Sequence, residues 1–229
     1  MLSPWWYPPI RTAAAQENLS ARFAGAHEER LTHRLEAFSD IVMGFSLAQM
    51  SLSFVMPAHP ADVYTHSIAP IAFVATFLIV ATTWYSHHWL FDHLFVPTAS
   101  TIVVNFATLA SIIWLTYQFQ LYVHFAPTVD HAFATVSYLV TFGTMWILLA
   151  LLYGISLRVG WNSIPADDRE AGAFKTGRLA TIGLATILTT LIVWEFHQPI
   201  ETTFWVIFVA GVLWRIVGRN LAGRFRAVR

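Results

Sequence analysis

The stretch that decides the fold is RLEAFSDIVMGFSLAQMSLSFVM, residues 34–56. Most of it is apolar and compatible with a helix of about 20 residues, the length that crosses a bilayer. Yet it opens with Arg34, Glu36 and Asp40 and carries the amide of Gln49 near its middle. Polar groups in that position need protein or water as partners. The segment is therefore predicted to be a membrane helix that does not lie wholly against lipid.

The whole chain has the composition of a polytopic membrane protein. Of its 229 residues, 56% are hydrophobic and 11% are charged, with a mean hydropathy of +0.56, which excludes an ordinary soluble domain. Alternating strand patterns are absent, which excludes an outer-membrane barrel. The predicted fold class is all-α with six transmembrane helices, at roughly 35–56, 68–94, 101–124, 132–157, 179–197 and 202–221.

The basic residues indicate an orientation in the membrane. All 13 Lys and Arg lie before the first window, between the fourth and the fifth, or in the last part of the sixth and after it. The positive-inside rule then places both termini and the polar loop 158–178 in the cytoplasm. We expect a cytoplasmic N-terminal tail (1–30), a six-helix transmembrane domain (31–222) and a basic cytoplasmic C-terminal tail (223–229). The predicted location is the plasma or inner membrane, as a multi-pass protein.

Helical periodicity divides the first window into faces. At 100° per residue, one stripe contains Phe38, Phe45, Gln49, Leu52 and Met56. Glu36 and Asp40 share a different face, where they either pair with Arg34 at headgroup level or join a buried network. For Gln49 two interpretations stay open, a hydrogen bond between helices and a water-filled path.

A second polar stretch, TTWYSHHWLFDHLF at residues 82–95, closes the second window. Its histidines, His87, His88 and His93, lie on the same side of the membrane as Asp40 in this topology. An imidazole can bond a carboxylate through one nitrogen and a further partner through the other, which favours a histidine–carboxylate network. The histidines show no fixed pairing with further ligands and the chain has no cysteine, so no metal site and no cofactor are predicted.

Together these motifs resemble the transmembrane protein 175 family of potassium channels. The resemblance rests on R-x-x-x-F-S-D in the first window, H-H-x-L-F in the second and an early Asn in the third, which are Arg34, Phe38, Ser39, Asp40, His87, His88, Leu90, Phe91 and Asn105. It covers about the first half of the chain at motif level. Beyond that it extends only to helix number and length.

The resemblance implies a homotetramer in which four first helices line a pore without a TVGYG-type filter. It also implies a structural network that holds the pore helix, and a constriction one and two turns further along. Carried onto this sequence, the network is Arg34, Phe38, Ser39, Asp40, His87, His88 and Asn105, and the constriction is Phe45, Gln49 and Leu52. The chain departs from the family at the constriction, where Phe45 replaces the usual isoleucine, Ala48 a threonine and Gln49 an aliphatic residue.

The predicted function is a channel for monovalent cations, favouring potassium, and no enzymatic activity is predicted. The expected partners are potassium or other monovalent cations, further copies of the chain and membrane lipid, with no nucleic acid. A proton-coupled transporter using Asp40, Asp92 or Glu195 is one alternative. A haem or metal membrane protein is another, but the histidines near opposite ends of the windows form no evident pair at one depth.

Overall fold

The computed structural model describes residues 13–52, 68–125 and 131–196. Within these ranges the chain forms five α-helices, so the predicted all-α class is confirmed. They are α1 (Ala13–Ser51), α3 (Ile68–His93), α4 (Ala99–Phe125), α5 (His131–Val159) and α6 (Ala166–Glu195). Helices α3 to α6 are each long and apolar enough to cross a membrane. The window predicted at 202–221 lies outside the described residues.

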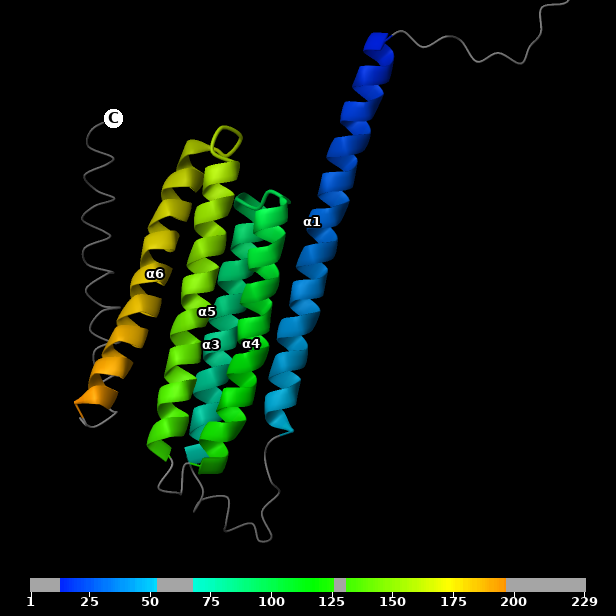
Figure 1. Cartoon of the computed structure of the whole chain (residues 1–229). Coiled ribbons are helices and arrows are strands. Elements are labelled where there is room, and N and C mark those ends of the chain that lie inside the picture. Colours follow the sequence, from blue (N-terminus) through cyan, green and yellow to red (C-terminus); the bar gives the residue numbers. More distant parts are fainter. Residues whose placement is uncertain (1–12, 53–67, 126–130, 197–229) are drawn as a thin grey trace, which may run out of the picture.

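Helix α1 is the longest described helix and carries the stretch with the unusual polar residues. It runs for 39 residues and extends well beyond the end of the neighbouring helices (Figure 1). Its first turns, from Ala13, fall within the segment 1–30 that the sequence assigned to a tail. Its second half packs against α3 and α4, which is the part that positions the candidate site.

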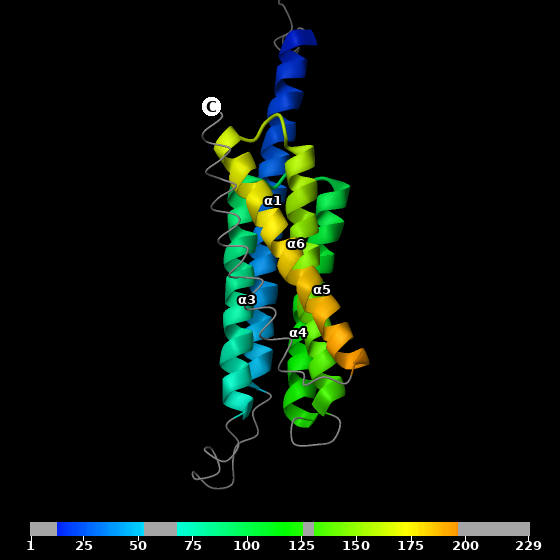
Figure 2. The same ribbon diagram turned by 90° about the vertical axis from the view of Figure 1, so that its left-hand side faces the viewer.

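The remaining helices form a bundle behind α1. Helix α4 contacts α1, α3 and α5, while α6 packs on α5 (Figures 1 and 2). The core between the helices is apolar and includes the fully buried Met43, Leu90, Ile112, Leu115, Leu149 and Tyr153. The hydroxyl of Tyr153 donates to the backbone oxygen of Ser86, so the phenol links α5 to α3 inside this core.

Helices α5 and α6 approach each other closely at two glycines. A Cβ atom placed on Gly183 would lie 2.7 Å from the backbone oxygen of Gly143, and one placed on Gly143 would lie 2.8 Å from the oxygen of Gly183. Small residues allow this backbone contact, as is common between membrane helices. Neither glycine can be replaced by a larger residue without a shift of one of the two backbones.

The prediction of a polar loop at 158–178 is wrong for most of that range, because residues from Ala166 onward belong to helix α6. Pro165 precedes the helix with φ −55° and ψ 149°, and Asp167 and Asp168 lie in the first turn, where negative charge is favourable. The later Lys175 places its Nζ 3.3 Å from the ring centroid of Trp89 on α3. An aromatic partner of this kind lets a charged residue lie on a packed helix.

Candidate functional site

The two faces of α1 have opposite environments. Leu35, Ser39, Met43, Ser46 and Met50 are buried against the bundle, at the spacing of one helical face. The residues predicted as the constriction lie on the other side: Phe45 is 72% and Leu52 80% exposed, and Gln49 is exposed as well. Phe38, on the same stripe, is 46% exposed. A single chain therefore leaves this stripe uncovered.

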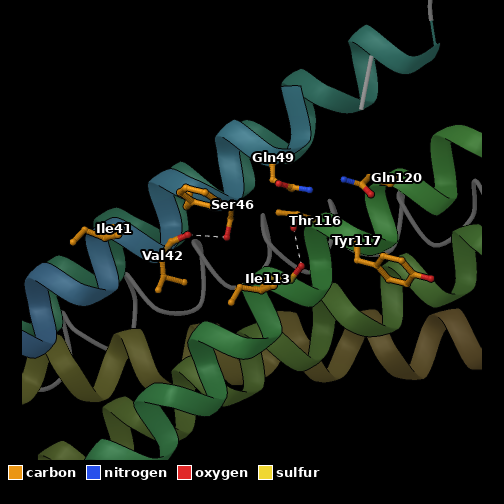
Figure 3. A pocket seen from close by; sticks show the side chains of 9 residues that line it. Ile41, Val42, Ser46, Gln49, Ile113, Thr116, Tyr117 and Gln120 are labelled. Atoms are coloured by element: carbon orange, nitrogen blue, oxygen red, sulfur yellow. Dashed lines mark hydrogen bonds between the residues drawn. The ribbon is translucent and has the colours of Figure 1, made fainter. Parts of the chain in front are cut away.

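A groove between α1 and α4 runs beside that stripe. It has a volume of about 390 Å³ and is lined by Phe45 and Gln49 from α1 and by Thr116, Tyr117 and Gln120 from α4, with four further residues (Figure 3). Gln49 and Gln120 point toward one another in this view. A second hollow of about 680 Å³ continues past the same residues toward Leu52 and His124. The stripe therefore borders a partly polar space.

The α4 side of this groove was not predicted from the sequence. Thr116, Gln120 and His124 recur at intervals of four residues in the second half of α4, which places them on one face. That spacing was the available signal. The polar lining is shared between α1 and α4, whereas the expected lining came from α1 alone.

Three of the predicted network residues meet behind the stripe. The Nε2 of His87 lies 2.7 Å from Oδ1 of Asn105, and Nδ2 of Asn105 donates to Oγ of Ser39 at 3.5 Å. All three side chains are buried, with at most 1% exposed. Because an amide oxygen only accepts, Nε2 of His87 is the donor in this contact and carries a proton. The contacts connect α1, α3 and α4 at one point.

The remaining network residues lie elsewhere. Asp40 is exposed and accepts a hydrogen bond from Nε1 of Trp84 at 2.8 Å, and not from a histidine. Phe38 packs edge-on against Phe106, with ring centroids 5.7 Å apart. Arg34 is exposed, and within the described part of the chain no hydrogen bond or ion pair involves it. Thus α1 is attached to α3 through Asp40 and to α4 through Phe38.

His88 belongs to a different cluster from its neighbour His87. Its Nδ1 lies 2.9 Å from Oε1 of Glu36 on α1, and its Nε2 lies 3.3 Å from Oδ2 of Asp92 on its own helix. The ring also stacks on Trp84, with centroids 5.7 Å apart. The two adjacent histidines therefore serve different contacts between α1 and α3.

Most of these residues lie in a segment that matches a known protein family. The sequence model of the family described as "Endosomal/lysosomal potassium channel TMEM175" matches residues 34–115. Residues 34–115 carry the TMEM175 family pattern. The matched segment contains Arg34, the FSD triplet, both adjacent histidines and Asn105, so the resemblance stated from the sequence is confirmed. The TMEM175 family is one of ion channels, which is not a class of enzymes.

Solved structures agree with the TMEM175 fold. The lysosomal potassium-selective channel TMEM175 homolog from Chamaesiphon minutus is 18% identical with a TM-score of 0.64, over 82% of this chain and 98% of that chain. A point variant of the potassium channel MtTMEM175, solved in complex with a nanobody fusion protein, is 16% identical with a TM-score of 0.62, over 83% and 93%. At these identities the likeness concerns the fold. No curated protein matches the sequence.

Proposed function

We propose that this chain is a subunit of a homotetrameric channel for monovalent cations, favouring potassium, in which the α1 helix of each subunit lines the pore. The observation that carries the proposal is the exposed stripe Phe45, Gln49 and Leu52 on a helix whose opposite face is packed. Lipid is a poor environment for a face that carries an amide, whereas a central water-filled path suits it. Around a central axis, four copies of the stripe would face one another.

The proposal gives each residue of the stripe a role. Four Phe45 rings near the axis would form an apolar constriction, which resists a hydrated cation by dewetting. Gln49, one turn further along, would place amides beside the groove that Thr116 and Gln120 line from α4. Arg34, Phe38, Ser39, Asp40, His87, His88 and Asn105 would hold α1 in place from behind. Asp40 and Asn105 supply contacts to two different helices for that purpose.

Conduction can be tested with purified protein reconstituted in planar bilayers under a potassium–sodium gradient. We expect discrete currents whose reversal potential lies nearer that of potassium, from an assembly with the mass of four chains. Absence of current from such an assembly would contradict the channel. Saturable uptake driven by a proton gradient would instead support a transporter.

The proposed topology has six spans with both termini in the cytoplasm of the cell membrane, organised as tail (1–30), transmembrane domain (31–222) and basic tail (223–229). It is supported by the alternation of basic segments and by the charged start of α6, with Arg169 and Lys175 near its first turns. The chain has no cysteine, so a single cysteine replacing Asp167 can be labelled without background. We expect this cysteine to be labelled only from the cytoplasmic side. Labelling from outside intact cells would show that the orientation is the opposite one.

A further inference from the structure

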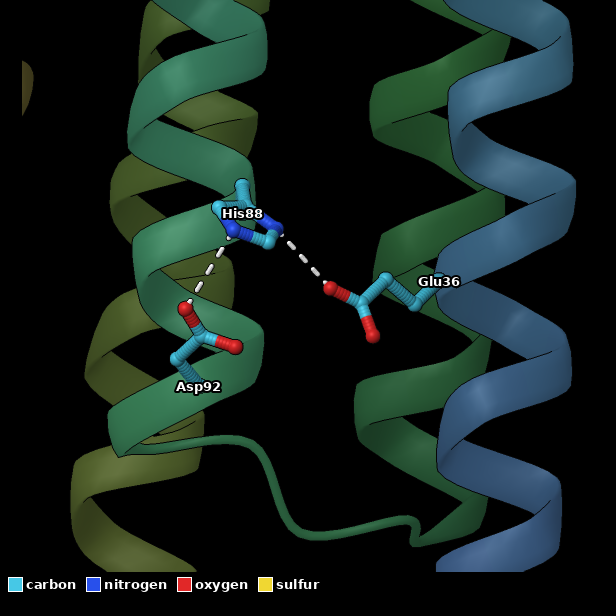
Figure 4. A group of neighbouring side chains, drawn as sticks. All are labelled: Glu36, His88 and Asp92. Carbon is cyan, nitrogen blue, oxygen red and sulfur yellow. Dashed lines mark hydrogen bonds and ion pairs between the residues drawn. The ribbon is translucent and has the colours of Figure 1, made fainter.

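We propose that Glu36, His88 and Asp92 form a binding site for a divalent transition-metal ion of the zinc class, joining α1 to α3. Each of these side chains offers one ligand atom, and the three atoms lie within 4.8 Å of one another (Figure 4). The cluster is separate from the buried contacts of His87. It does not depend on whether the protein conducts ions.

The positions of the ligands suit a metal that ties two helices together. His88 and Asp92 are one turn apart on α3 and therefore share a face, the same i, i+4 spacing by which paired ligands on one helix hold zinc. Glu36 reaches the same point from α1, with Oε1 2.9 Å from Nδ1 of His88. In Figure 4 the imidazole lies between the two carboxylates. Small side-chain rotations would direct all three ligands to a common centre.

The charges of the cluster call for a cation. A neutral imidazole has one N–H, so His88 cannot donate to both Glu36 and Asp92 at once. Even an imidazolium brings only one positive charge to two carboxylates. Within the described ranges, the ion pairs of Glu36 and Asp92 are formed with histidines only. A divalent ion would balance both carboxylates and leave the imidazole as a neutral ligand.

The kind of ligand favours a transition metal over magnesium or calcium. An imidazole nitrogen suits zinc, copper, iron and nickel, whereas the hard cations prefer oxygen alone. His33 supplies another imidazole nearby, since its Nδ1 lies 3.7 Å from Oε2 of Glu36. The site is also accessible: the side chains of His88 and Asp92 are 43% and 48% exposed. In the single chain the cluster is therefore not enclosed by the helices.

A neighbouring aromatic residue holds the central ligand in position. The indole of Trp84 stacks on the His88 ring, and its Nε1 is fixed by a hydrogen bond to Asp40. Residues that orient a ligand in this way commonly strengthen a metal site. The imidazole is thus restrained before a metal arrives, which lowers the cost of ordering it.

The test is zinc binding to purified protein from which any histidine tag has been removed, measured by competition with a chromogenic chelator. We expect stoichiometric binding at this site in the wild type. Glu36→Gln, His88→Gln and Asp92→Asn should each weaken it by at least about tenfold. The matched control is His93→Gln, in the same turn of α3, whose imidazole contacts the backbone oxygen of Trp89. This control should bind zinc as the wild type does.

Thermal unfolding supplies a second readout on the same preparations. Zinc should raise the melting temperature of the wild type and of His93→Gln, because a ligand that binds the folded state stabilises it. It should raise that of the three ligand variants much less. Absence of zinc binding in the wild type, or equal affinity in the ligand variants, would overturn the site. Neither measurement involves ion flux, so a negative result would leave the channel proposal unaffected.

Discussion

Replacing Phe45 with alanine is expected to raise potassium flux through reconstituted protein by about tenfold or more. The ring is 72% exposed on the uncovered face of α1, and four such rings would close the proposed pore. Alanine removes most of that apolar surface, so water and a hydrated ion pass more easily. A reduction of only about 1.4 kcal/mol in the barrier is enough for a tenfold change in rate.

The Phe45 prediction has two matched comparisons. Phe45→Trp enlarges the ring and should lower the flux, while Ser46→Ala should change it little. Ser46 lies on the packed face, and its hydroxyl donates to the oxygen of Val42 in its own helix. If Phe45 instead packs between subunits, Phe45→Ala should cost about 3–5 kcal/mol of stability without raising flux. Flux and melting temperature measured on the same preparations separate these outcomes.

Replacing Asn105 with leucine is expected to destabilise the protein by about 1–3 kcal/mol. The amide connects His87 to Ser39, and all three side chains are buried. Leucine fills a similar volume but leaves Nε2 of His87 without its acceptor. A buried donor that loses its partner lowers the stability of the folded protein by the full free energy of its removal from water. The melting temperature of the purified protein should fall accordingly.

A control and a double variant sharpen the Asn105 test. Thr108→Val, about one turn further along α4, removes a buried hydroxyl that donates to the backbone oxygen of Val104 in its own helix, and should cost less stability. Combining His87→Leu with Asn105→Leu removes both polar partners, so the double variant should be more stable than Asn105→Leu alone. A melting temperature of Asn105→Leu equal to that of the wild type would refute the network.

The sequence allowed prediction of the faces of α1, because a period of 3.6 residues fixes which side chains share a side. Phe45, Gln49 and Leu52 do emerge on an exposed face, opposite Met43 and Met50. What these residues do in an assembled protein is not determined by their exposure in one chain. Their role in a pore stays a proposal for that reason.

Contacts between helices were predicted less completely. His87 and His88 are adjacent in sequence, yet successive residues on a helix point about 100° apart, so they entered two different clusters. Which histidine turns toward Asn105 and which toward Glu36 depends on the rotation of α3 against its neighbours. The start of α6 was also predicted wrongly, because Asp167 and Lys175 are typical of a loop. Both lie on the helix, where Lys175 contacts the ring of Trp89 on α3.

Thiol modification at position 45 shows whether α1 lines an ion pathway. The cysteine-free chain allows a single Phe45→Cys variant to be recorded in a potassium gradient while a charged, water-soluble thiol reagent is added. The matched control is Leu188→Cys on α6, which is also exposed in the single chain. We expect the reagent to abolish most of the potassium current of Phe45→Cys and to leave that of Leu188→Cys unchanged. A Phe45→Cys current that persists after complete labelling would contradict it.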